Sequence, residues 1–101
     1  MVLNLTKNNF DEVKNSKKPV LIDFFASWCG PCRMLSPVID EIAEENPEYL
    51  ICKVNVDKEP ELARDFKILS IPTLAVLREG SLVTKTSGAR PKEAILALLE
   101  A

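Results

Sequence analysis

Two cysteines separated by two residues, Cys29 and Cys32, follow closely after the apolar run 20–26. The run predicts a buried β-strand. Pro31 suits the first turn of a helix, because that turn has no intrahelical acceptor for an N–H and the φ of proline is already helical. A disulfide needs Cα atoms roughly 4.4–6.8 Å apart, which residues at i and i+3 of a helical turn can satisfy. The pattern therefore predicts a strand that leads into a helix whose first turn carries a reversible disulfide.

The two sulfurs are expected to have different roles. A helix N-terminus presents unpaired N–H groups and a partial positive charge, which favour the nucleophilic thiolate. The apolar positions that follow lie at i, i+3, i+4, i+7 and i+8 of one helix and are Leu35, Val38, Ile39, Ile42 and Ala43. Extended backwards, this stripe places Cys32 on the buried face and Cys29 at an exposed tip. We therefore predict that Cys29 is the attacking nucleophile and Cys32 the resolving thiol. Arg33 lies off the stripe and is either a charge that favours the thiolate or an ordinary surface arginine.

Composition indicates one ordinary globular domain over residues 1–101. The chain is 47% hydrophobic and 28% charged with a net charge of −2, and its length is sufficient for its own core. The longest basic run is Lys17–Lys18, which argues against nucleic-acid binding. No apolar stretch approaches the ~20 residues needed to cross a bilayer. The first residues do not resemble a signal peptide, so we expect a cytoplasmic protein, although a mature exported form would lack its signal too. Nothing in the sequence demands more than a monomer.

Three cysteines and no histidine restrict the other chemistry of the chain. A structural zinc site needs four Cys or His ligands, so no metal site within one chain is expected, and only a site shared between subunits stays open. Cys52 lies among the apolar residues of the segment 50–56 and is expected to be an inert core residue. The glycines are isolated and form no phosphate-binding loop, so no bound cofactor is expected.

Two polar residues interrupt apolar strands. Asp23 shares a strand face with Leu21 and Phe25, and Lys53 lies in the next strand. Burial raises the pKa of a carboxyl group unless the group is paired. Asp23 is therefore either a proton acceptor and donor for Cys32, with Lys53 balancing its charge, or half of a buried ion pair that only persists in the fold. The residues alone leave both interpretations open.

The remaining chain alternates strand and helix patterns without linkers or repeats. The expected strands are 2–5, 19–26, 50–56, 73–77 and 82–86, with a hairpin turn at Glu79–Gly80, and the expected helices are 8–16, 32–46, one that begins at Pro60 and one that begins at Pro91. This order predicts an α/β domain built on a βαβ unit.

These motifs together resemble the thioredoxin family. The resemblance rests on the segment Trp28–Cys32, on Asp23 and Phe24 before it, on Pro37 within the helix and on Ile71-Pro72-Thr73 further along the chain. It extends from about Val2 to Leu99. It implies the thioredoxin fold, a central five-stranded mixed sheet flanked by four helices, with a helix kink at Pro37. It also implies the acid–base role for Asp23, with Lys53 beside it.

The resemblance further implies a binding patch around the nucleophile. An X-Pro bond is cis in only about 5–6% of cases, but the family has a cis proline at the position of Pro72, packed against the disulfide. The backbone of Ile71 would then bind an extended substrate segment. The implied patch comprises Trp28, Gly30, Pro31, Ile71, Pro72 and Gly88. From the residues alone, core packing is the alternative for Trp28, and a turn glycine is the alternative for Gly88. Ser87 stands where the family often has an apolar residue.

The function implied is that of a general protein disulfide reductase working by thiol–disulfide exchange. A flavin-containing thioredoxin reductase would restore the dithiol with electrons from NADPH, and the clients would be disulfide-containing proteins. One alternative is an oxidase or isomerase domain, whose relatives more often have a histidine between the cysteines. Another is a binding module or subunit with incidental redox activity.

Overall fold

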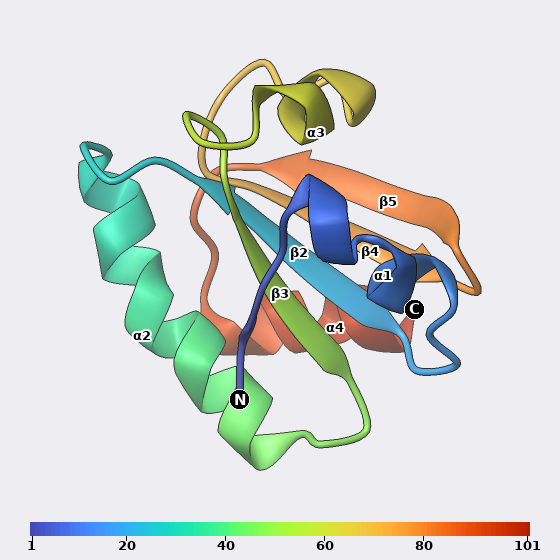
Figure 1. Ribbon diagram of the computed structural model, residues 1–101. Coiled ribbons are helices and arrows are strands. Elements are labelled where there is room, and N and C mark those ends of the chain that lie inside the picture. Colours follow the sequence, from blue (N-terminus) through green and yellow to red (C-terminus); the bar gives the residue numbers. More distant parts are fainter.

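The computed structural model describes all 101 residues and contains one five-stranded sheet of order β1-β3-β2-β4-β5 (Figure 1). Its strands are β1 (Leu3–Asn4), β2 (Val20–Phe25), β3 (Leu50–Asn55), β4 (Thr73–Arg78) and β5 (Ser81–Ser87). β1, β3 and β2 run parallel, whereas β4 and β5 are antiparallel to their neighbours. The sheet is therefore mixed, as expected, and β2 lies at its centre.

Four helices cover the two faces of this sheet: α1 (Asp11–Lys14), α2 (Gly30–Glu45), α3 (Pro60–Asp65) and α4 (Lys92–Glu100). α1 and α3 lie on one face, and α2 and α4 lie on the other (Figure 1). No helix is both long enough and apolar enough to cross a membrane.

The helix expected over residues 8–16 is shorter than predicted. A 3-10 turn, Lys7–Asn9, comes first, and α1 begins only at Asp11. The Thr6 hydroxyl accepts a hydrogen bond from the Asn8 N–H at 3.2 Å, and the Asn9 side chain accepts one from the Thr6 N–H at 2.7 Å. Such local side-chain bonds compete with the regular helix, which explains the later start.

Strand alternation divides the core between the two sheet faces. Val20, Ile22 and Phe24 pack with the side of α1 and α3. Leu21 packs with the side of α2 and α4. The predicted stripe of α2 is confirmed, with Leu35, Ile39, Ile42 and Ala43 buried and Val38 half-buried.

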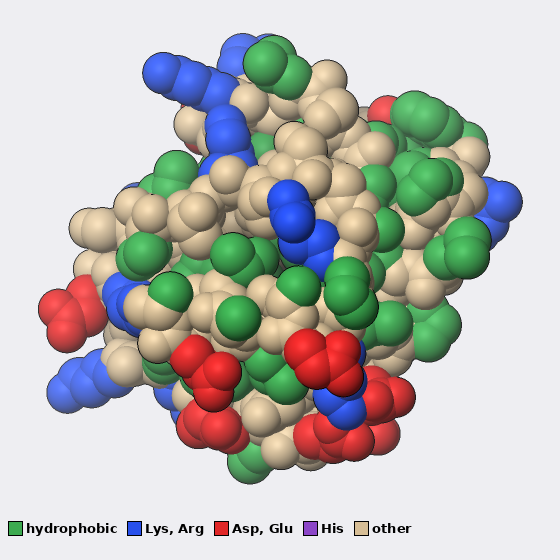
Figure 2. All heavy atoms as spheres, turned by 180° about the vertical axis from the view of Figure 1, so that it is seen from behind, with side chains coloured by type: hydrophobic (Ala, Val, Ile, Leu, Met, Phe, Trp, Pro, Cys, Tyr) green, Lys and Arg blue, Asp and Glu red, His purple; other side chains and the backbone are tan.

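Ion pairs join the last turns of α2 to the first residue of α4. The Lys92 ammonium contacts the carboxylates of Glu41 and Glu45. Figure 2, which shows the molecule from behind, has acidic side chains gathered at its lower end.

Pro37 lies within α2 and cannot donate to the Arg33 carbonyl, so one helical hydrogen bond is missing. The kink expected there stays a prediction.

The β4–β5 turn gives a stability prediction. Glu79 and Gly80 have φ of 51° and 81°, the left-handed values that a two-residue hairpin turn of type I′ requires. A Cβ at position 80 would also lie 3.0 Å from the carbonyl oxygen of Lys14. We expect Gly80→Ala to lower the free energy of unfolding by about 1–3 kcal/mol, measured by chemical denaturation. Glu79→Asn is the matched control and should be neutral or stabilising, because Asn tolerates positive φ. An equally stable Gly80→Ala variant would contradict this account of the turn.

Candidate active site

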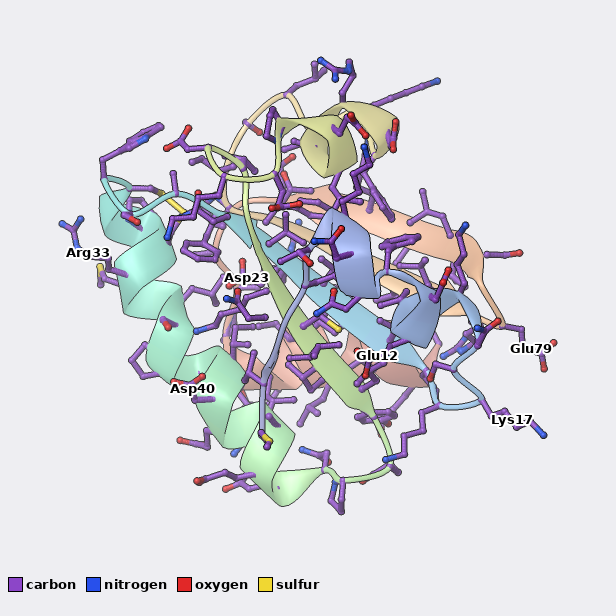
Figure 3. All side chains as sticks on the ribbon, viewed as in Figure 1. Glu12, Lys17, Asp23, Arg33, Asp40 and Glu79 are labelled. Carbon is purple, nitrogen blue, oxygen red and sulfur yellow. A yellow bond between two sulfur atoms is a disulfide. The ribbon has the colours of Figure 1, made fainter.

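Cys29 and Cys32 form a disulfide at the start of α2 (Figure 3, yellow bond). Their Cα atoms are 5.3 Å apart, within the range that the spacing predicted. Cys29 is the N-cap of α2, and its Sγ accepts a hydrogen bond from the Cys32 N–H at 3.2 Å. When the disulfide opens, the Cys29 sulfur therefore lies at an N–H donor and at the positive end of a 16-residue helix. Both features favour the thiolate.

The expectation that Cys29 lies at an exposed tip is wrong. Cys29 is only 5% exposed and Cys32 is 3% exposed, because the segments around the helix start pack over both. The two cysteines differ instead in the space that they border. Cys29 lines an open surface groove, and Cys32 lines a separate, smaller cavity. The two cysteines therefore differ in the opening that each lines and not, as predicted, in their exposure.

The groove beside Cys29 has a volume of about 580 Å³ and is mostly apolar. Its lining comprises Trp28, Cys29, Gly30, Pro31, Val56, Ala63, Ile68, Leu69, Ser70 and Ile71. Four members of the implied patch are among them: Trp28, Gly30, Pro31 and Ile71. Trp28 is 70% exposed, so its interpretation as a core residue is wrong.

Five groove residues escaped the sequence analysis: Val56, Ala63, Ile68, Leu69 and Ser70. The sequence signal available was weak: Ile68 and Leu69 are two apolar residues in the segment before Pro72. In the structure Leu69 is 97% exposed and lines the same apolar groove as Trp28, which is also exposed.

Pro72 and Gly88 do not line the groove, and a backbone hydrogen bond joins them to each other. Pro72 is buried, its bond to Ile71 is cis as the resemblance implied, and its carbonyl accepts a hydrogen bond from the Gly88 N–H at 2.8 Å. Gly88 has a φ of 94°, so it is a turn glycine. Ile71 packs against the cysteine pair. The hydrogen bond between Gly88 and Pro72 thus fixes the chain at the residue that follows Ile71.

Trp28 is anchored by a residue that the sequence analysis missed. Its indole Nε1 donates to Asp57 Oδ2 at 2.9 Å. The Asn55 side chain accepts hydrogen bonds from the N–H groups of Asp57 and Lys58, at 3.0 and 3.3 Å, and so orders this loop. Asp57 comes just after β3, the parallel neighbour of β2, so the carboxyl ends of the two strands bring it close to Trp28.

Asp23 is a buried carboxyl group without a complete set of partners. It is 1% exposed, and its Oδ1 has no hydrogen-bond partner. Burial raises the pKa of Asp23 to about 6, against the lowering effect of Lys53 and with a further raising effect of Asp40. The cavity of about 230 Å³ beside it is also lined by Cys32 and Lys53, so the structure brings these three predicted residues together.

One alternative from the sequence was a buried ion pair between Asp23 and Lys53, and this pair does not form. No nitrogen–oxygen distance between the two side chains is within 4.0 Å. The Lys53 ammonium instead contacts the Ser36 hydroxyl and lies 3.4 Å from Asp40 Oδ1. Ser36 and Asp40 were missed, although they stand four and eight residues after Cys32 and hence on its side of the helix.

Of the last two candidate residues, Cys52 lies apart from this network, whereas Arg33 lines the edge of the same cavity. Cys52 is a free cysteine with no exposed surface, and burial raises the pKa of its thiol to about 12. This confirms its place in the core and leaves it little thiolate near neutral pH. Arg33 is exposed and donates to the Ser27 carbonyl at 3.0 Å.

Comparison with known proteins decides the family, because the family model described as "Thioredoxin" matches residues 1–101. The chain belongs to the thioredoxin family. It is 45% identical over 98 residues to a thioredoxin of Alicyclobacillus acidocaldarius, a match that covers 96% of this chain and 93% of that protein. It is 49% identical over 86 residues to a thioredoxin of Mycobacterium bovis, covering 84% of this chain and 74% of the relative.

A longer relative and a solved structure support the family assignment and the fold. The chain is 48% identical over 88 residues to the bifunctional thioredoxin reductase/thioredoxin of Mycobacterium leprae, covering 86% of this chain but only 19% of that protein. A solved thioredoxin variant from Halobacterium salinarum superposes with a TM-score of 0.91 at 33% identity, over 98% of this chain and 88% of the other. The thioredoxin fold is therefore confirmed. Family membership and the Cys29–Cys32 disulfide make this chain a thiol–disulfide oxidoreductase that acts by dithiol–disulfide exchange.

Proposed function

We propose that this thioredoxin reduces disulfides of client proteins with Cys29 as nucleophile and Cys32 as resolving thiol. The observation that supports this assignment is the pair of openings: Cys29 faces the apolar groove, and Cys32 faces the cavity that holds Asp23. A client disulfide can approach Cys29 from the larger, open groove. The hydrogen bond from the Cys32 N–H also stabilises charge on the Cys29 sulfur and not on the Cys32 sulfur.

The exchange then takes two steps. The Cys29 thiolate attacks one sulfur of the client disulfide, a mixed disulfide forms, and the other client sulfur leaves as a thiolate that takes up a proton. Cys32, once deprotonated, attacks the Cys29 sulfur and releases the second client sulfur. The client gains two electrons and two protons, and the Cys29–Cys32 disulfide is left behind.

Asp23 is the proposed proton acceptor for Cys32 in the second step. Its pKa of about 6 makes it ionised at neutral pH yet close enough to that pH to take up a proton. Lys53 supplies a positive charge at the edge of the same cavity without neutralising Asp23 by direct contact. Both residues are thus proposed as acid–base residues of the reaction.

The groove is proposed to bind an extended client segment. Trp28 and Leu69 offer exposed apolar surface beside Cys29, and the backbone of Ile71 lies at the same groove. Extended segments bind such sites through main-chain hydrogen bonds, with apolar side chains filling the surface. Gly30 and Pro31 line the groove beside the Cys29 sulfur. The hydrogen bond between Gly88 and Pro72 is proposed to hold the chain next to Ile71 in place.

We further propose that a flavin-containing thioredoxin reductase restores the dithiol with electrons from NADPH. The bifunctional relative of Mycobacterium leprae carries both names in one protein, which supports such a pairing. The thioredoxin itself would work in the cytoplasm as a monomer, with no cofactor of its own.

The reduction potential of the Cys29–Cys32 couple tests this function. Equilibration against a defined thiol–disulfide buffer, followed by mass spectrometry of trapped thiols, should give a potential more negative than that of the glutathione couple. NADPH oxidation in the presence of thioredoxin reductase and a disulfide client should then depend on the chain. A potential at or above the glutathione couple would indicate a disulfide donor or isomerase. The absence of any reversible two-electron couple would leave the binding module as the explanation.

A further inference from the structure

The Lys53 side chain is held by α2 rather than by the acidic strand residue next to it. Asp23 and Lys53 are register partners in the parallel pair β2–β3, so both side chains leave the same face of the sheet toward α2. The Lys53 ammonium nevertheless contacts Ser36 and lies 3.4 Å from Asp40 Oδ1, and it does not pair with Asp23. Asp23 Oδ1 therefore has no hydrogen-bond partner, although Lys53 lines the same cavity.

We propose that Ser36 and Asp40 are positioning residues, which hold the Lys53 ammonium out of contact with the Asp23 carboxylate. The inference rests on the proposed role of Asp23 as the proton acceptor for Cys32. An ammonium in direct contact would occupy the free Asp23 oxygen and stabilise the charged form of the carboxyl group. A carboxylate stabilised in this way is a weaker base, so it would take the Cys32 proton less readily.

The charged groups around Asp23 come from two elements. β3 contributes Lys53, and α2 contributes Asp40 and, at the edge of the cavity, the exposed Arg33. Cys32 also lines the cavity and becomes a titratable thiol only when the disulfide is reduced. β4, on the other side of β2, places the apolar Leu74 opposite Asp23. Figure 3 labels Asp23 on β2 and Asp40 on α2. Asp40 therefore raises the pKa of Asp23 in two ways. Its own negative charge disfavours the Asp23 carboxylate, and its ion pair with Lys53 keeps the ammonium away from that carboxylate.

Two substitutions separate these effects. Ser36→Ala removes a contact of Lys53 without changing any charge, whereas Asp40→Asn removes both the ion pair and the negative charge. Both positions lie outside the buried core: Ser36 is half-buried and Asp40 is exposed. The proton occupancy of Asp23 in the reduced protein can be followed by carbon-13 NMR of its carboxyl group. We expect its titration midpoint to fall in each variant, by about 1 pH unit when both are combined.

Matched controls accompany the titration. Ser36→Thr keeps the hydroxyl and should leave the midpoint in place. Glu44→Gln removes one negative charge from an exposed position of the same helix and should also leave it in place. The pH profile of client disulfide reduction is recorded for every variant, and its acidic limb should move with the Asp23 midpoint.

Each other outcome overturns a defined part of the inference. An unchanged Asp23 midpoint in Ser36→Ala would show that the α2 contacts do not position Lys53, because this variant alters no charge, whereas Asp40→Asn also removes a charge that acts on Asp23 directly. An equal fall in Glu44→Gln would reduce the effect to the net charge of the helix. A lowered midpoint with an unchanged pH profile would show that the positioning does not serve the reaction, and it would locate the failure in the proposed role of Asp23.

Discussion

Replacing Cys29 with serine is expected to lower the rate of disulfide reduction at least about 1,000-fold. A serine hydroxyl is not ionised near neutral pH, so the hydrogen bond from the Cys32 N–H and the helix N-terminus have no sulfur anion to stabilise. The rate can be measured by the reduction of insulin disulfides with dithiothreitol as the electron source. Activity close to that of the unmodified chain would reject Cys29 as the nucleophile.

The partner substitution separates the two sulfur roles. Cys32→Ser should still attack a client through Cys29 but should be unable to release it, so a covalent mixed disulfide should accumulate and be visible by mass spectrometry. If Cys29→Ser accumulates the adduct instead, the proposed roles are reversed. Cys52→Ala is the matched control. It removes the third sulfur from the core and should lose stability while keeping its activity.

Much of the fold could be predicted because its signals are local. The stripe of α2 depends only on the spacing of its own apolar residues, and Leu35, Ile39 and Ile42 are buried as that spacing requires. The turn at Glu79–Gly80 likewise follows from two neighbouring residues. Where the local signal was mixed, as at Thr6 and Asn9, side-chain capping replaced the expected start of a helix with a 3-10 turn.

The site could be predicted only in part, because its walls come from distant segments. The spacing of Cys29 and Cys32 predicted the disulfide, but the burial of Cys29 depends on loops that the helix pattern does not describe. Leu69 joins the groove through the path of the loop before Pro72. The family resemblance implied that Lys53 lies beside Asp23, and the strand register confirms this, yet the partner of Lys53 depends on how α2 crosses the sheet.

Asp23→Asn is expected to change stability and turnover in opposite directions. Burial raises the pKa of Asp23 from 3.8 to about 6, so the folded chain binds more protons than the unfolded chain between these two values. The free energy of unfolding therefore falls as the pH rises through this window, and the whole cost is present above about pH 6. Asparagine carries no such charge, so the variant should be more stable at pH 7 by up to about 3 kcal/mol.

Denaturant titrations at several pH values measure this difference. The advantage of Asp23→Asn should be absent near pH 3 and should grow until about pH 6. The exposed Asp65 provides the control, because Asp65→Asn changes the same chemical group at the surface and should show no comparable trend. A stability advantage that does not vary with pH would argue against ionisation of the buried carboxyl group as its cause.

The turnover of the same variant decides what the buried carboxyl group is for. Without a proton acceptor, Cys32 must lose its proton to solvent, and we expect the release of the mixed disulfide to slow about 100-fold near neutral pH. Rapid mixing with a disulfide client should show a normal first step and a slow second one. If Asp23 were only a remnant of packing, the asparagine variant would gain stability and keep its rate. Stability alone favours asparagine at position 23. If removal of the carboxylate stabilises the chain and slows only the second step, the Asp23 carboxylate therefore serves the reaction.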